Sequence, residues 1–165
     1  METNLSQLIL AQLIDKRLVV LQRRLDSLPV ELPEREASFA ALQAESDEVI
    51  AERKACLARA NDLENQVSTR EERIAKLEKL ALESVDPSSA QVARHEADGL
   101  RAANSDDQEE ELELLERADT LAEKRTELTA KITEMEADLV AFRSNVKTDD
   151  KDLKAEGETL AGQRS

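Results

Sequence analysis

The chain has 165 residues, of which 37 are acidic and 23 are basic, so its formal net charge is −14. It contains two aromatic residues, Phe39 and Phe142, with only three glycines and three prolines. A globular domain of this length normally has several core aromatics and many Gly or Pro turns, so the composition excludes an ordinary globular core. With 40% hydrophobic and 36% charged residues, it indicates long helices or a coiled coil.

The charge and the cysteine count also exclude several kinds of function. A net charge of −14 repels nucleic-acid phosphates, and an aromatic platform for single strands is missing. One cysteine, Cys56, and one histidine, His95, do not make a four-ligand zinc set, so we expect no metal or other cofactor in this chain. Polar residues interrupt the N-terminal apolar residues, which excludes a secretory signal. We therefore expect a cytoplasmic protein that binds no membrane and binds no nucleic acid through this segment.

A heptad repeat, here called the first seam, runs through the first half of the chain. Its positions alternate by four and three residues, and 16 of the 20 are apolar. Such uninterrupted spacing specifies a left-handed coiled coil rather than an isolated amphipathic helix. The positions are Ile14, Leu18, Leu21, Leu25, Leu28, Leu32, Arg35, Phe39, Leu42, Ser46, Val49, Arg53, Cys56, Ala60, Leu63, Val67, Arg70, Ile74, Leu77 and Ala81.

A similar repeat, here called the second seam, occupies the last third of the chain, and 11 of its 14 positions are apolar. The positions are Leu114, Ala118, Leu121, Arg125, Leu128, Ile132, Met135, Leu139, Phe142, Val146, Asp149, Leu153, Glu156 and Leu160. Between the two seams, Pro87 should end the first arm near Ser84, and Ser88 with Gln91 resembles a capping box that starts a new helix. Two long arms with so short a connection fold back on each other. The sequence thus predicts an all-α, elongated antiparallel coiled-coil hairpin with arms at 5–83 and 89–163 and a turn at 84–88.

Two irregularities are predicted within these arms. Pro29 and Pro33 should kink the first arm, with the heptad phase retained. In the second arm the apolar repeat fails between Leu100 and Leu112, and Ser105 with Gln108 resembles another capping box. We therefore expect a kink near Gly99–Ser105, between a short helix near 89–103 and a long helix from about 106.

Two sets of residues in the chain form recognisable motifs. The N-terminal set is Leu5, Leu8, Ala11–Asp15 and Leu25–Pro29, and the more specific set is His95-Glu96, Leu100-Arg101 and Ser105–Arg117. With these motifs the chain resembles, over roughly 5–160, the bacterial coiled-coil proteins that carry a C-terminal C4-type zinc ribbon, in particular the actinobacterial members. The departures are Asp107 in place of an apolar residue, Leu115 in place of Met, and no aromatic before His95.

The resemblance implies a zinc ribbon after residue 165, so we expect this chain to be a truncated form and zinc to belong only to the full-length protein. It also implies a role as chaperone or adaptor for an alternative sigma factor, in secretion or flagellar regulation, or in RNA binding.

The candidate partner-binding residues lie within the more specific segment of the resemblance. Seven of the eleven residues from Asp106 to Glu116 are acidic, which suits either a solvated helix face or a docking surface for a basic partner. His95 is interpreted as a surface histidine with a packing or partner role, not as a catalyst, because no nucleophile or oxyanion donor accompanies it. The candidates are His95, Glu96, Asp106, Asp107, Glu109, Glu110, Glu113, Glu116 and Arg117.

Four arginines occupy seam positions and are candidates for setting the antiparallel register: Arg35, Arg53, Arg70 and Arg125. Polar seam residues cost stability but specify register, although long arginines can also extend past a loose seam. A turn centred near 85–86 would place Ser46 opposite Arg125 and Phe39 opposite Ile132. Cys56 is expected to be an inert seam residue.

We expect a non-enzymatic adaptor or chaperone-like arm that binds proteins. Two other functions stay open: a nucleic-acid-binding protein that binds through the missing ribbon, and a structural homodimer in which the seams pair between chains.

Overall fold

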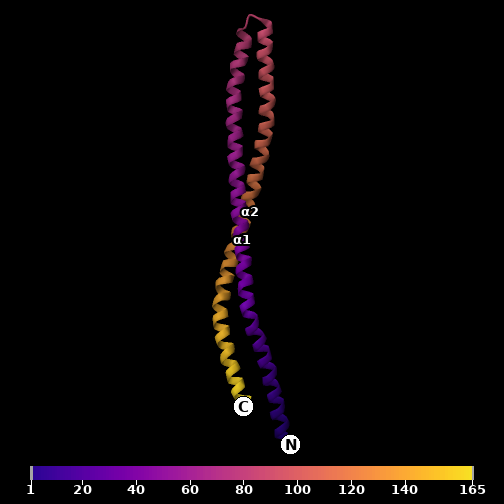
Figure 1. Cartoon of the computed structure of the whole chain (residues 1–165), viewed down its shortest axis with the longest axis vertical. Coiled ribbons are helices and arrows are strands. Elements are labelled where there is room, and N and C mark those ends of the chain that lie inside the picture. Colours follow the sequence, from indigo (N-terminus) through magenta and orange to yellow (C-terminus); the bar gives the residue numbers. More distant parts are fainter. Residues whose placement is uncertain (1, 165) are drawn as a thin grey trace. The chain divides into compact units, whose positions relative to one another are not determined.

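In the computed structural model, which describes residues 2–164, the chain forms two long helices, α1 (Glu2–Glu83) and α2 (Pro87–Arg164). The two helices pack against each other in opposite directions, with the connection at residues 84–86 (Figure 1). The predicted all-α helical hairpin is therefore confirmed.

The heptad repeats account for the burial along both helices. Every member of the first seam except Arg35, and every member of the second seam except Arg125, is buried or half-buried. Buried members include Leu21, Val49 and Leu63 on α1. The seams therefore pack on each other within one chain.

α1 is continuous through Pro29 and Pro33, so the prolines do not interrupt it. Each lacks the amide that would bond to the carbonyl four residues earlier, but both prolines are exposed and Leu28 beside them is buried. The phase of the seam is retained across this segment, as the sequence predicts.

The predicted interruption of the second arm is wrong. α2 is a single helix through Gly99, Ser105 and Gln108, and no residue of the described chain has a positive φ. The buried line continues at heptad spacing, because polar residues take the seam positions where apolar ones run out. This line is Ala90, Ala93, Ala97, Leu100, Asn104, Asp107, Glu111 and Leu114, all buried or half-buried. A polar seam with partners on the facing helix does not require a break.

The chain divides into two compact units, which we describe separately. Unit 1 comprises Met1–Ala44 and Thr129–Ser165, and unit 2 comprises Glu45–Leu128. Unit 2 contains the connecting turn and a small core beside it. Alanines on α2 allow the helices to approach closely there, against the larger Ile74 and Leu77 of α1. The core comprises Ile74, Leu77, Ala81, Ala90, Ala93 and Ala97, with Leu100 against it.

The turn starts α2 earlier than predicted and with a different cap. Asp86, not Ser88, is the N-cap: its Oδ1 accepts the Ser88 amide at 3.2 Å, and its Oδ2 accepts the Ser89 hydroxyl at 2.9 Å. Pro87 is the first helical residue, where its missing amide costs nothing. These two hydrogen bonds hold the pKa of the Asp86 carboxyl below its ordinary value, with the Ser89 hydroxyl as the larger cause.

The cap predicts a pH-dependent contribution to stability. Because the pKa of Asp86 is lower in the folded state, its contribution is present above the ordinary carboxyl pKa of about 4 and is lost as pH falls through the folded-state value. Asp86→Ala should therefore lower the melting temperature at pH 7 and leave it nearly unchanged at pH 2. Thermal melts of both proteins across this range, followed by circular dichroism, measure the effect. An equal deficit at both pH values would show that the carboxylate is not the cap.

Candidate interaction surface

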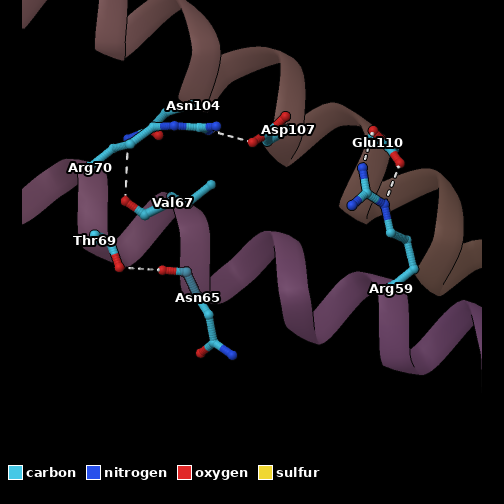
Figure 2. A network of polar contacts seen from close by, with 8 residues as sticks. All are labelled: Arg59, Asn65, Val67, Thr69, Arg70, Asn104, Asp107 and Glu110. Carbon is cyan, nitrogen blue, oxygen red and sulfur yellow. Dashed lines mark hydrogen bonds and ion pairs between the residues drawn. The ribbon is translucent and has the colours of Figure 1, made fainter.

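The acidic segment from Asp106 to Glu116 is divided between two faces of α2. Asp107 and Glu110 point toward α1: Asp107 pairs with Arg70, and Glu110 pairs with Arg59 at 3.0 Å (Figure 2). The Glu110 carboxylate, as a hydrogen-bond acceptor and a nearby charge, raises the pKa of the Arg59 guanidinium. These two carboxylates are therefore part of the hairpin and not of a free docking surface.

Asn104 is a seam residue that sequence reasoning missed. It is 6% exposed, and its Nδ2 donates to the Val67 carbonyl at 3.4 Å (Figure 2). Its Oδ1 is buried and has no hydrogen-bond partner among the described residues. The heptad spacing indicated its position. Steps of four, three and four residues from Leu100 reach Asn104, Asp107 and Glu111, so these polar residues continue the seam.

The remaining acidic candidates lie on the outside of α2. Asp106, Glu109, Glu113 and Glu116, here called the outer acidic face, are all exposed, and they make no ion pair within residues 2–164. Exposed leucines flank them, with Leu112 at 58% exposure and Leu115 at 40%. The outer acidic face is therefore a charged surface with apolar side chains beside it.

The other candidate partner-binding residues have different surroundings. Glu96 pairs with Arg73 at 3.0 Å, and Arg117 pairs with Glu52 at 2.8 Å, so both participate in contacts between the helices of unit 2. His95 is exposed on α2. Of the nine candidates, the structure thus places four on the outer acidic face and uses Glu96, Asp107, Glu110 and Arg117 within the hairpin.

The four candidate register residues also differ from one another. Arg70 forms a half-buried ion pair with Asp107. Arg53 is half-buried, and its Nε has no partner in the part of the chain that the structure describes. Arg35 lies over the Phe142 ring, 4.1 Å from the centroid, and Arg125 is exposed.

The alignment of the two helices in unit 2 is close to the one expected from the position of the turn. Lys124 pairs with Glu45 at 3.2 Å, one residue before each member of the expected pair Arg125 and Ser46. The placement of the turn thus predicted the alignment of the helices in unit 2.

The Arg70–Asp107 pair predicts a strongly non-additive response to substitution. Asp107→Leu removes the anion from a half-buried guanidinium and should lower the free energy of unfolding by about 1–2 kcal/mol. Arg70→Leu combined with Asp107→Leu should recover most of this loss, because two leucines fit an apolar seam. Urea unfolding of the single and double variants measures the coupling, and the exposed Arg59–Glu110 pair, replaced likewise, is the control that should change little.

The double variant also tests whether this pair sets the register. If it does, the leucine variant should populate other alignments or oligomers, which molar-mass determination detects. An unchanged hairpin would contradict register control.

No three His, Cys, Asp or Glu side chains between residues 2 and 164 lie close enough together to hold a metal ion. In the same range, no helix is both long and apolar enough to cross a membrane. Cys56 is a free, half-buried thiol on the first seam.

Comparison with known proteins adds no assignment: no family model, no curated protein and no solved structure matches the chain.

Proposed function

We propose that this chain is an adaptor arm that binds a protein partner through the outer acidic face of α2. The observation that carries the proposal is the division of the acidic segment. Asp107 and Glu110 are paired across the hairpin, whereas Asp106, Glu109, Glu113 and Glu116 are exposed and have no cation among the described residues. A hairpin does not need this second set for its own stability.

The chemistry of this surface favours one class of partner. Four unpaired carboxylates on consecutive turns attract a basic segment and speed its association at low salt. Leu112 and Leu115 beside them supply apolar contact area, which purely electrostatic binding lacks. The expected partner segment is therefore a basic amphipathic helix or strand.

The resemblance to the zinc-ribbon coiled-coil proteins suggests where such a partner would be found. A regulatory sigma factor or a secretion or flagellar component would fit this proposal. Two Cys-x-x-Cys pairs in the reading frame beyond Ser165 would support the relationship, and their absence would leave the adaptor proposal to depend on the outer acidic face alone.

Charge reversal tests the proposal directly. We would replace Asp106, Glu109, Glu113 and Glu116 with lysine and compare the proteins captured from lysate by the native chain and by this variant, using quantitative mass spectrometry. The matched control replaces four other exposed acidic residues of unit 2: Asp47, Glu48, Glu64 and Glu72. This control makes the same change in net charge.

The expected result is a partner that the control retains and the outer-face variant loses, with capture that weakens as salt is raised. The same partners captured by all three proteins would exclude the outer acidic face as the docking surface. A partner lost by both variants would show that its binding depends on the net charge of the chain and not on the outer acidic face.

A further inference from the structure

A groove in unit 1 is lined by residues of both helices and is apolar at its base. Its volume is about 640 Å³, and its floor is formed by Leu42, Met135 and Leu139. Leu139 is buried, whereas Leu42 and Met135 are half-buried. All three are seam residues, and methionine adapts its shape readily to an incoming side chain. The floor therefore offers a part of the seam on which further apolar side chains can pack.

The rim of the groove carries mainly carboxylates. Glu34, Glu134 and Asp138 line it and are exposed, and they form no ion pair among residues 2–164. A fourth lining carboxylate, Glu31, pairs at 3.1 Å with Arg24 of its own helix. No cation of the facing helix therefore neutralises these carboxylates within the described chain.

Two cations also line the groove, but they do not balance its rim. Arg35 lies over the Phe142 ring, 4.1 Å from its centroid. Lys131 is the first lining residue of α2. Because the helices run in opposite directions, it lies at the end of the groove to which α1 contributes Leu42. The groove is thus acidic along most of its length.

The alignment of the helices explains why the rim lacks its own cations. In unit 2, charged residues that directly precede seam residues pair across the hairpin, as Glu45 does with Lys124 at 3.2 Å. Two heptads before Glu45 and two heptads after Lys124 are Glu31 and Asp138, which also directly precede seam residues. Both line the groove, so the position that holds an ion pair in unit 2 holds two like charges here. A cation from another molecule would complete this position.

We propose that the groove binds a basic amphipathic helix of a partner protein, which packs along α1 and α2 as a third helix. The lining residues of α1 recur in steps of three and four between Glu31 and Leu42, which is the spacing of one helix face. This stretch is about 16 Å long, or three helical turns. The apolar face of the partner helix packs on Met135 and its neighbours in the floor, and its lysines or arginines lie between Glu31 and Asp138.

The combination of an apolar floor and an acidic rim selects this occupant over others. A nucleic acid or an anionic bilayer is repelled by the unpaired carboxylates. Two copies of the chain joined groove to groove would bring the same carboxylates together. A polyamine would satisfy the charges but would leave the apolar floor uncovered. The proposal concerns unit 1 alone and is independent of the outer acidic face in unit 2.

Photo-crosslinking of the full chain with a defined peptide tests the proposal. The probe is a helical peptide of about three heptads, with leucine at the seam positions, lysine at the others and a benzophenone amino acid in place of one central leucine. After irradiation, mass spectrometry locates the attachment. We expect adducts on Met135 and the other floor residues, with a yield that saturates with peptide concentration and falls as salt is raised. Adducts on Leu112 or Leu115 report the outer acidic face, so the two sites are measured separately.

Asp138→Lys is the decisive variant. The new lysine would pair with Glu31 across the groove, as Lys124 pairs with Glu45, and would repel a basic helix. The yield of groove adducts should therefore fall more than about five-fold. Glu136→Lys is the matched control: it makes the same change in charge at an exposed residue of α2 that does not line the groove, and the yield should stay within about two-fold of the native value.

A second peptide separates helix docking from attraction by charge alone. It has the same composition, but its leucines are distributed around the helix, and it should give at least about five-fold fewer groove adducts. Equal yields from the two peptides would overturn the proposal. So would adducts only outside the groove, or groove adducts that Asp138→Lys leaves unchanged. Sedimentation equilibrium of the native chain tests the other occupant, since a dimer that Asp138→Lys disrupts would mean that a second copy fills the groove and not a partner helix.

Discussion

Replacing Leu63 with alanine is expected to lower the free energy of unfolding of unit 2 by about 3 kcal/mol. Leu63 has 0% exposure and is one of the two largest side chains that are fully buried. Alanine keeps the helix propensity but leaves a cavity against α2, and each helix has only one neighbour from which to refill it. Urea unfolding followed by far-ultraviolet circular dichroism measures the loss.

The matched control for Leu63 is Leu112→Ala. Leu112 is 58% exposed, so the same change in side chain removes little buried area, and the unfolding free energy should fall by less than about 0.5 kcal/mol. Equal losses for the two variants would mean that the seams do not carry the stability of the hairpin.

Replacing Pro29 and Pro33 with alanine is expected to stabilise unit 1. A proline inside a helix costs about 3 kcal/mol relative to alanine, and part of this cost is offset because proline also restricts the unfolded chain. We therefore expect a gain of about 2 kcal/mol for each substitution. Both prolines are exposed within α1, so alanine leaves no cavity. Thermal melts and hydrogen exchange of the amides between residues 20 and 40 measure the gain.

Val30→Ala serves as the control for this pair, because it changes an exposed residue between the two prolines without restoring an amide. It should leave hydrogen exchange nearly unchanged. Exchange rates in the proline variants that equal those of the native chain would show that the two missing amides do not limit the stability of this segment.

Much of the fold was predictable because the spacing of apolar residues determines which side chains pack in a coiled coil. The alternation of four and three residues identified Ile14, Val49 and Leu63 as buried without any structure. The short connection around Pro87 predicted the antiparallel direction, and the turn position predicted the alignment seen at Glu45 and Lys124.

Two predictions were wrong, the break in the second arm and the N-cap at Ser88, because both were based on short sequence motifs without knowledge of the surrounding structure. Ser105 and Gln108 resemble a capping box, but α2 continues through them because Asn104 and Asp107 find Val67 and Arg70 on α1. At the turn, Ser88 was a plausible cap, and only the backbone path showed that Asp86 performs this role.

The candidate site was only partly predictable. Heptad spacing indicates that Asp107 lies on the seam, but not which flanking carboxylates pair with a cation on α1. A carboxylate such as Glu110 differs from Glu109 only in its position around the helix relative to α1.

By itself, the sequence determined the helical class, the two seams and the reversal of the chain, because these depend on residue spacing and on backbone limits at Pro87. The tertiary structure decided which charges are used internally and which remain exposed. That outcome depends on the facing helix: an ion pair such as Arg70–Asp107 needs two residues distant in sequence to meet. The exposed Leu13 and the groove beside Leu139 likewise became recognisable as surfaces only when the packing of unit 1 was known.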